Sequence, residues 1–303
     1  IGGNHFIHAI RRNVDLNVIL FNNEIYGLTK GQYSPTSKLG KITKTSPYGT
    51  VEKPFNPGEL VIGSKGTFFA RSIDMEVGLS KECMIAAAKH KGMSVIEVLQ
   101  NCVIFNDKTH YAFAADKATR AEHTVTLRHG EKMLFGANNE KGIVFENMKL
   151  KVVTVGQDGY TLDNVLTHDA HERDTTLHSM LAGMKYPEYP VALGVIRAVE
   201  DDTVYDRAVE KQVEEVKAAS KIHCVDAPLG SDMGGGINTR HIDEKSVGTS
   251  RSSGAFSNFG LSGLPFAVYR RLHETLYPVT ALLLFAEQRT FDNLAHLLDA
   301  HGP

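Results

Sequence analysis

The chain is poor in cysteine: it has three in 303 residues, an odd number, and they are widely spaced. This usage argues against a disulfide framework and favours a reducing compartment, so we expect a cytoplasmic location. No stretch combines a charged start with an apolar core as a secretory signal peptide does. The longest apolar run, near Ala281–Ala286, is far shorter than the roughly 20 residues that a membrane-spanning helix needs. We therefore expect no membrane association.

The chain also has no large excess of one charge. Lys and Arg number 33 against 35 Asp and Glu, and the two signs are interspersed. This distribution gives no electrostatic footprint for nucleic acid. The 42% apolar content suffices for a sizeable core, and the length suits an ordinary soluble enzyme of one or two domains.

Short apolar runs alternate with helical patterns along most of the chain. We expect strands at Asn17–Phe21, Thr67–Ile73, Ser94–Leu99 and Val191–Ile196, with weaker strand patterns at His123–Leu127 and Lys149–Thr154. Helical spacing covers Ile1–Arg12, Ser80–His90 and Asp206–Ser220. The alternation predicts an α/β fold in which a parallel sheet is flanked by helices.

Three finer expectations concern burial. The strand at 17–21 reads as buried. The helix at 80–90 places Met84, Ile85 and Ala88 on one face, and the helix at 206–220 turns Val209, Val213 and Val216 inward. The segment Thr36–Leu60 is rich in Pro, Lys, Ser and Thr and predicts a long surface loop, which in a compact domain is usually functional.

The composition changes after residue 227. Residues 228–303 begin with a Gly- and Ser-rich stretch typical of a flexible linker, and helical patterns follow at Phe266–Leu276 and Ala281–Leu298. We therefore expect one domain over residues 1–227 and, over residues 228–303, a linker and helical tail of unknown role.

The most informative segment follows the first predicted strand. The apolar run Val18–Phe21 ends in two adjacent amides, Asn22 and Asn23, and then enters a loop punctuated by glycine. In open α/β sheets ligands bind at the carboxyl ends of the strands. Neutral oxygens at such an end suit a phosphate-bound Mg²⁺, which takes about six hard oxygen ligands. An isolated Asn pair would equally well cap a strand and begin a turn.

The string from Leu20 to Ser37 is longer than a simple turn requires. It resembles the second half of the thiamine-diphosphate motif, in which Gly-Asp-Gly is followed further along by Asn-Asn. The continuation Tyr26-Gly27-Leu28-Thr29-Lys30-Gly31-Gln32 and then Ser34-Pro35-Thr36 resembles the β subunit of 2-oxoacid:ferredoxin oxidoreductases, and among them the 2-oxoglutarate type. The resemblance runs from Ile1 to about Ala227 and implies the thiamine-diphosphate-binding fold.

The resemblance implies roles for five residues. Asn23, through its side-chain oxygen, and Ile25, through its carbonyl, would bind Mg²⁺ on the diphosphate. Gly27 and Leu28 would contact the cofactor, with Leu28 wedged beneath it to bend it. Lys30 would lie near the carboxylate of the 2-oxoacid or near coenzyme A, because a flexible cation suits either anion.

Cys102 would be the fourth ligand of a [4Fe–4S] cluster in this family. Asn101 departs from the family, which often has proline there. The other three thiolate ligands, and the aspartate of Gly-Asp-Gly, would lie upstream of Ile1. Such a cluster needs four thiolates, and Cys83 and Cys224 are not placed to supply them. We therefore expect the chain to be an N-terminally truncated fragment that cannot hold the cluster alone.

The reaction implied is the oxidative decarboxylation of a 2-oxoacid, 2-oxoglutarate by preference, to acyl-CoA and CO₂, with electrons passed through the cluster to ferredoxin. The partners implied are an α subunit, which carries the activating glutamate, together with ferredoxin, the 2-oxoacid and coenzyme A, in an αβ or (αβ)₂ assembly. One alternative is an inactive fragment or interaction protein that keeps the fold. Another is a decarboxylase of the acetolactate synthase type, against which Cys102 and Thr29–Gln32 argue.

Two other patterns do not predict sites. His168 and His171 are three residues apart in an Asp-rich turn, whereas the zinc signature on a helix has two His four apart. The triple Gly234–Gly236 lacks the Lys and Ser or Thr of a phosphate-binding loop.

Overall fold

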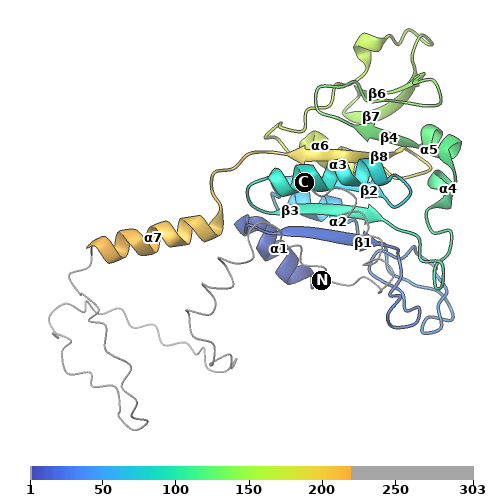
Figure 1. Cartoon of the computed structure of the whole chain (residues 1–303). Helices are drawn as coiled ribbons and strands as arrows, with labels where there is room; N and C mark the ends of the chain where they lie inside the picture. The colour runs from blue at the N-terminus through green and yellow to red at the C-terminus, as the bar shows by residue number, and fades with distance from the viewer. Residues whose placement is uncertain (1, 220–303) are drawn as a thin grey trace, which may run out of the picture. The chain divides into compact units, whose positions relative to one another are not determined.

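Five strands form the larger of two β-sheets in the computed structural model, which describes residues 2–219 (Figure 1). Their order across the sheet is β1, β3, β2, β8, β4. The bounds are β1 Asn17–Asn22, β2 Phe68–Ile73, β3 Ser94–Leu99, β4 Thr124–Leu127 and β8 Val191–Ala198.

The sheet is mixed but mainly parallel. Strands β1, β3 and β2 are parallel to one another, and so are β8 and β4. The pair β2 and β8 is antiparallel, so the predicted parallel sheet contains one antiparallel junction. The α/β class with helices on the sheet is confirmed. Because β1 and β3 are parallel neighbours, the loops that follow them meet at the same edge of the sheet.

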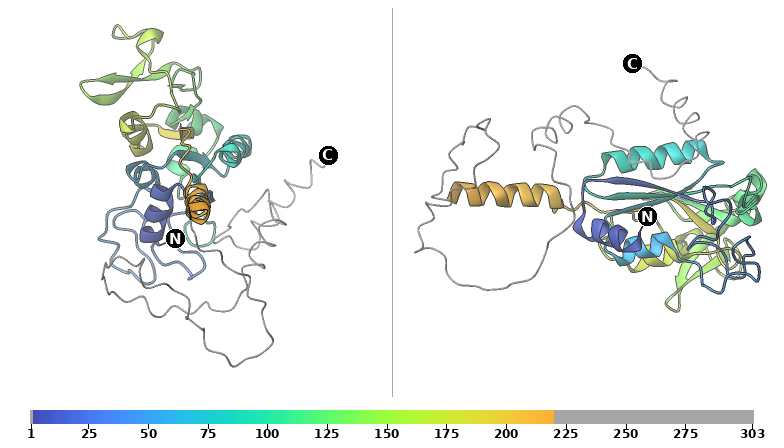
Figure 2. Two further views of the ribbon diagram at one scale, coloured as in Figure 1. Left: turned by 90° about the vertical axis from the view of Figure 1, so that its left-hand side faces the viewer. Right: turned by 90° about the horizontal axis from the view of Figure 1, so that it is seen from below.

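Helices cover both faces (Figure 2). On one face lie α1 Gly3–Arg12, α2 Pro57–Gly63 and α6 Thr176–Gly183, and on the other lies α3 Val77–Lys89. Phe69 and Val95 face the first group, whereas Phe68 and Ile96 contact the core beneath α3. Strand residues therefore alternate between two apolar cores, as the two-residue period of a strand requires.

Two helix termini have clear local causes. The Asn56 side chain accepts hydrogen bonds from the main-chain N–H groups of Gly58 and Glu59, and Pro57 occupies the first turn, where its missing N–H costs little. Helix α1 ends at Asn13, which adopts a left-handed conformation with φ of 50°. The long loop expected over residues 36–60 therefore ends at Asn56, and the expectation of loop at residues 57–60 is wrong.

The burial expected for β1 is wrong, and the buried face of α3 is not the one that Met84, Ile85 and Ala88 share. Strand β1 is at the sheet edge with every residue half-buried, because β3 is its only neighbour among the described strands. In α3 the buried residues are Leu79, Cys83 and Ala87, whereas Ile85 is 45% exposed. Small residues at this spacing allow the helix to pack closely on the sheet, and the larger Ile85 takes the outer side.

A second, antiparallel sheet contains β5 Leu134–Phe135, β6 Lys141–Glu146 and β7 Lys149–Thr154. The strand at 149–154 is confirmed, but its two partners are not evident from the sequence. Short helical segments complete this region: α4 Tyr111–Ala114, α5 Lys117–His123 and the 3₁₀-helix Leu162–Asn164.

The last described element is α7, Tyr205–Ala219. It has no buried residue, so the inward placement expected for Val209, Val213 and Val216 is wrong. Contacts divide the chain after Lys211, and the helix from Gln212 belongs to a second unit. Cys224, Gly234–Gly236 and the whole of the predicted 228–303 tail lie outside the described residues. Among residues 2–219, no helix has the length and apolar character needed to cross a membrane.

Candidate functional site

The turn that follows β1 projects from the carboxyl edge of the sheet. The main-chain N–H of Tyr26 donates to the Gln32 carbonyl at 2.8 Å, and that of Gly31 donates back to the Tyr26 carbonyl at 3.1 Å. Lys30 and Gly31 have positive φ values of 66° and 97°, which close the turn, and glycine adopts this conformation without strain. Leu28 is 73% exposed and Lys30 is also exposed, so the tip of the turn presents both side chains outward.

Asn22, the last residue of β1, is fixed by several hydrogen bonds. Its Nδ2 donates to Glu97 Oε1 at 2.7 Å, and its Oδ1 accepts from Thr36 Oγ1 at 2.7 Å. His110 Nε2 lies 3.0 Å from the Asn22 carbonyl, which can only accept, so this nitrogen carries the proton. Burial lowers the pKa of His110, in agreement with a neutral ring.

Asn23 and Ile25 adopt a compact turn. Asn23 Oδ1 accepts from the Ile25 N–H at 3.3 Å, a long hydrogen bond that leaves most of the oxygen's capacity free. Other carbonyls of this stretch accept hydrogen bonds: those of Asn22, Asn23, Glu24, Tyr26 and Gly27. Among the described residues, no donor reaches the carbonyl of Ile25.

The loop that follows β3 packs against this turn. Within it, the Asn106 N–H donates to the Cys102 carbonyl at 2.9 Å. A Cβ placed on Gly27 would lie 3.8 Å from Cys102 Sγ, and one on Gly31 would lie 3.1 Å from Phe105 Cδ1. Gly31 therefore allows the thiol loop to approach the Tyr26–Gln32 turn closely, whereas a Cβ on Gly27 would be in ordinary contact with Cys102.

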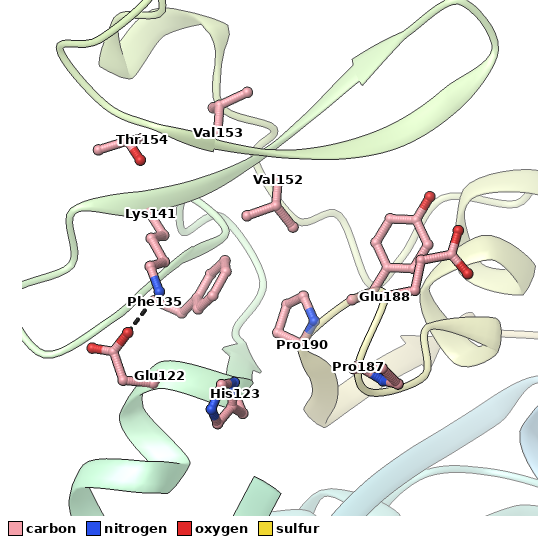
Figure 3. A pocket seen from close by; sticks show the side chains of 11 residues that line it. Glu122, His123, Phe135, Lys141, Val152, Val153, Thr154, Pro187, Glu188 and Pro190 are labelled. Atoms are coloured by element: carbon pink, nitrogen blue, oxygen red, sulfur yellow. Dashed lines mark hydrogen bonds and ion pairs between the residues drawn. The ribbon is translucent and has the colours of Figure 1, made fainter.

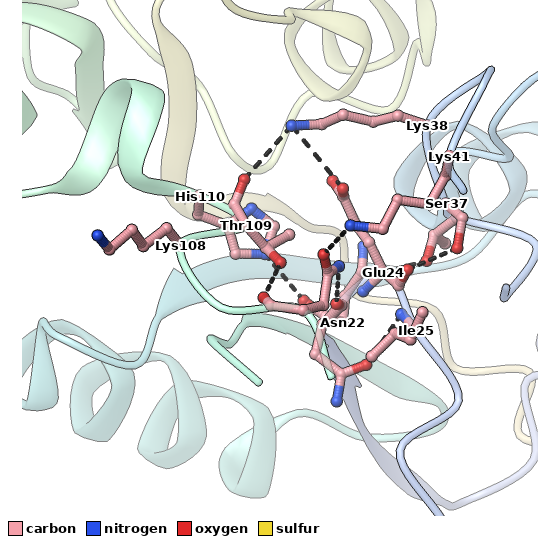
Figure 4. Close-up of polar contacts among 12 residues, drawn as sticks. Asn22, Glu24, Ile25, Ser37, Lys38, Lys41, Lys108, Thr109 and His110 are labelled. Atoms are coloured by element: carbon pink, nitrogen blue, oxygen red, sulfur yellow. Dashed lines mark hydrogen bonds and ion pairs between the residues drawn. The ribbon is translucent and has the colours of Figure 1, made fainter. Parts of the chain in front are cut away.

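Charged side chains join the two loops from above (Figure 4). Lys38 Nζ lies 3.8 Å from Glu24 Oε2 and 3.3 Å from the Thr109 carbonyl, while Lys41 Nζ donates to Asn106 Oδ1. Burial raises the pKa of Glu24, and the two lysines oppose that rise. The long loop after residue 36 thus contributes cations to the edge of the sheet.

A buried ion pair supports the site from within the sheet. Arg71 on β2 donates through Nε to Glu97 Oε2 on β3 at 2.7 Å, and the two side chains are 6% and 2% exposed. The guanidinium also donates to the Ala182 carbonyl at 3.2 Å. Through Glu97 this pair holds the side chain of Asn22, so a polar ladder crosses three strands.

Comparison with known proteins gives this geometry a context. Residues 1–98 match the family described as thiamine pyrophosphate enzyme, C-terminal TPP binding domain. The chain is 40% identical over 221 residues to the 2-oxoglutarate oxidoreductase subunit KorB of Mycobacterium tuberculosis, covering 73% of this chain and 58% of that protein. It is 51% identical over 107 residues to the 2-oxoacid:ferredoxin oxidoreductase subunit beta of Saccharolobus solfataricus, covering 35% of each.

The chain is thus similar to β subunits of 2-oxoacid:ferredoxin oxidoreductases. It spans less than two thirds of the length of these curated relatives. A solved 2-oxoglutarate:ferredoxin oxidoreductase from Magnetococcus marinus, with 2-oxoglutarate, coenzyme A and succinyl-CoA bound, shares the fold with a TM-score of 0.51 and 23% identity. That likeness covers 71% of this chain and 58% of the other.

The structure brings four of the six predicted site residues together. Asn23, Ile25 and Gly27 lie in consecutive turns after β1, and Cys102 packs beside Gly27. Leu28 and Lys30 are at the exposed tip of the same turn. The available Asn23 amide oxygen and Ile25 carbonyl are neutral hard donors, so their chemistry fits Mg²⁺, although two ligands are far fewer than the ion takes.

Of the cysteines within the described residues, only Cys102 suits the predicted [4Fe–4S] cluster. Cys102 is partly exposed, as a ligand for an external group must be. Cys83 is fully buried on α3, and burial raises the pKa of its thiol to about 12, so it is unsuited to bind metal as a thiolate. The described residues therefore offer one thiolate of the four that the cluster needs.

Sequence reasoning missed the residues that support this site: Arg71, Glu97, Asn106, Lys38 and Lys41. For two of them a signal is present, since Arg71 and Glu97 are the single charged residues of two largely apolar strands, and a buried charge is almost always paired. Asn106 and the lysines carry no such signal, because their contacts join segments far apart in the chain.

The histidines around residue 170 are held by main-chain carbonyls and by the Arg197 side chain. His168 Nε2 lies 2.8 Å from the Val195 carbonyl, and Arg197 Nη1 donates to His178 Nδ1 at 2.8 Å. In residues 2–219 no group of three or more His, Cys, Asp and Glu side chains is arranged to hold a metal ion.

A pocket of ≈ 230 Å³ lies between α5, the small sheet and the loop before β8 (Figure 3). Lys141 Nζ contacts Glu122 Oε2 at 2.6 Å in its wall, and Val152, Pro187 and Pro190 are among the other lining residues that Figure 3 shows. It contains none of the predicted site residues, so the candidate site is the loop edge and not this pocket.

Proposed function

We propose that this chain is the thiamine-diphosphate-binding part of the β subunit of a 2-oxoglutarate:ferredoxin oxidoreductase. The reaction is the coenzyme A-dependent oxidative decarboxylation of a 2-oxoacid to acyl-CoA and CO₂, with electrons passed to ferredoxin. The observation that carries the proposal is the packing of Cys102 against Gly27. A thiol near this turn supports the proposal, because Cys102 would then bind a cluster close to the cofactor.

Asn23 and Ile25 would bind Mg²⁺ on the diphosphate through the amide oxygen and the carbonyl oxygen. Bound thiamine diphosphate supplies an electron sink for decarboxylation, and the protein supplies binding and orientation. Leu28 would pack beneath the cofactor, with Gly27 in contact beside it, and Lys30 would attract the carboxylate of the 2-oxoacid or an anionic group of coenzyme A. Cys102 would donate one thiolate to a [4Fe–4S] cluster, whose other ligands would come from outside the described residues.

A protein partner is supported by apolar side chains exposed around these loops. Leu28, Val103 and Ile104 are 73%, 72% and 68% exposed, and Ile42 and Tyr48 on the neighbouring loop are 68% and 101% exposed. Large exposed apolar groups in one region are typical of interaction surfaces. We propose the α subunit as the partner on this side, with ferredoxin as the electron acceptor and a cytoplasmic location for the complex. The division of the chain into a domain of residues 1–227 and a tail of residues 228–303 stays a prediction.

The test uses the natural subunit that contains this chain, produced together with its α subunit. We expect ferredoxin reduction that depends on both 2-oxoglutarate and coenzyme A, with slower turnover of pyruvate. Iron analysis should give about four irons with labile sulfide per β subunit. The proposal would be contradicted by a complex that contains thiamine diphosphate and iron but fails to reduce ferredoxin, whichever 2-oxoacid is supplied.

One substitution addresses the metal ligand. Asn23→Ala should weaken Mg²⁺-dependent binding of thiamine diphosphate by about tenfold or more, because it removes a hard oxygen ligand. Asn138→Ala is the matched control, since Asn138 is exposed beside the small sheet, away from the β1 turn. Equal affinities of the two variants, measured by calorimetry, would remove Asn23 from the site.

A further inference from the structure

Asn106 is buried at the contact between the two loops, with 7% of its surface exposed. Its Nδ2 donates to the Asn23 carbonyl at 2.9 Å, and its Oδ1 accepts from Lys41 Nζ. Its main-chain N–H donates to the Cys102 carbonyl at 2.9 Å, and its own carbonyl accepts from Thr109 Oγ1. All four polar groups of this one residue are therefore engaged, and they reach three separate segments of the chain.

We propose that Asn106 is a positioning residue that fixes the metal-ligand turn relative to the thiol loop. The inference rests on the proposed function, because it concerns the relative placement of the Asn23 turn and Cys102. In an enzyme that passes electrons from a cofactor beside one loop to a cluster beside the other, that relative placement must stay constant through turnover.

The chemistry of the contacts assigns the direction of the amide. Lys41 can only donate, so the oxygen of the Asn106 side chain must face it. The amide nitrogen then faces the Asn23 carbonyl, which can only accept. A carboxylate or an aliphatic side chain at position 106 cannot make both contacts, so the combination of a donor and an acceptor in one short planar group is what the position requires.

The hydrogen bond from Asn106 to the Asn23 carbonyl supports a stretch of backbone in an unfavourable conformation. Asn106 holds the carbonyl of the peptide between Asn23 and Glu24, and Glu24 adopts a left-handed conformation with φ of 53°. A residue with a Cβ seldom adopts this conformation without compensating contacts. With its carbonyl engaged by Asn106, Asn23 keeps its side-chain oxygen as the group available to a metal ion.

Asn101 provides a matched control on the same loop. Among residues 2–219 its side chain bonds only within the loop, with Nδ2 donating to Asp107 Oδ1 at 2.9 Å and Oδ1 accepting from the Lys108 N–H at 2.9 Å. Asn101→Ala therefore loosens the thiol loop without removing a contact to the Asn23 turn. Asn106→Ala removes the connection itself, and Asn106→Asp keeps the acceptor for Lys41 but loses the donor for Asn23.

The experiment compares these three variants with the wild type in the full αβ complex. The first measurement is the affinity for thiamine diphosphate with Mg²⁺, by calorimetry. We expect both Asn106 variants to bind about tenfold more weakly, as for the loss of a group that orients a metal ligand, and Asn101→Ala to bind within about twofold of the wild type. Wild-type affinity in Asn106→Ala, or an equal loss in Asn101→Ala, would overturn the proposal.

A second measurement, on the cofactor-free full chain, is independent of the reaction. Hydrogen exchange at the amides of Glu24 and Ile25, which donate to the side chains of Asn22 and Asn23, should be at least severalfold faster in Asn106→Ala than in Asn101→Ala. Cys83 must stay resistant to alkylation in every variant, which shows that the fold is intact. If the wild-type complex binds no thiamine diphosphate, the proposed function fails, and unchanged exchange would separately overturn the positioning role.

Discussion

The buried pair Arg71–Glu97 offers the sharpest test of how the sheet supports the site. Replacing Glu97 by Leu leaves the Arg71 guanidinium buried with only neutral acceptors, the Ala182 carbonyl at 3.2 Å and Asn56 Oδ1 at 3.4 Å. Replacing Arg71 by Met leaves the carboxylate buried with the Asn22 amide as its donor. Each single change should lower the free energy of unfolding by about 3–5 kcal/mol, because an uncompensated charge stays buried.

The double variant should be less damaged than either single variant. Arg71→Met with Glu97→Leu removes both charges and keeps apolar volume, so the main cost left is the unpaired amide of Asn22, about 1–3 kcal/mol. Taking each single change at about 4 kcal/mol, independent effects would sum to roughly 8 kcal/mol, whereas we expect about 2 kcal/mol for the double variant. The difference is the coupling energy of the pair.

The assay is urea unfolding of the four proteins, followed by far-UV circular dichroism. The exposed pair Arg128–Glu82 is the control, since its atoms are 3.1 Å apart but its side chains are 47% and 59% exposed. The same substitutions there should show a coupling below about 1 kcal/mol. The reasoning would be refuted if the losses of unfolding free energy at Arg71 and Glu97 were additive. It would also be refuted if each single loss were as small as at the control pair.

Three further predictions concern packing, pH and thiol access. Gly58→Ala should destabilise by about 1–3 kcal/mol in urea, because its Cβ would lie 2.6 Å from Phe69, whereas Gly63→Ala on the same helix meets nothing within 4 Å and should not destabilise. Burial lowers the pKa of His178 in the folded protein below 6.5, so its contribution to stability is present above pH 6.5 and is lost as the pH falls through the folded pKa. His178→Gln should therefore flatten the decline of the unfolding free energy below pH 6.5. An unchanged slope of unfolding free energy against pH would contradict this. Iodoacetamide should modify Cys102 in the native protein but Cys83 only after unfolding, since burial raises the Cys83 pKa to about 12; equal rates by peptide mass spectrometry would contradict it.

Much of the candidate site could be predicted from residues that are close in sequence. The turn after β1 is local: the run of apolar residues, the Asn pair and the glycines at 27 and 31 together specify a strand that ends in a tight, exposed turn. The same is true of the strand that precedes Cys102. Parallel pairing of the two strands then brings both loops to one edge, which the α/β pattern already implied.

The burial of β1 and the inner faces of α3 and α7 could not be predicted from the same patterns. Periodicity shows which residues share a face, but it does not show whether a neighbour covers that face. In α3 the small residues Cys83 and Ala87 face the sheet, and the larger Ile85 is exposed. Along α7 the regularly spaced valines have no covering partner within the described residues.

The fold class, the motif after β1 and the resemblance to thiamine-diphosphate enzymes could be read from the sequence, because they depend on local residue order and spacing. The support of Asn22 by Arg71 and Glu97 across three strands, and the link that Asn106 makes between the turn and the Cys102 loop, became evident from the three-dimensional contacts. These contacts depend on the register of parallel strands and on the path of a long loop. Both result from packing of the whole domain, and no short segment specifies them.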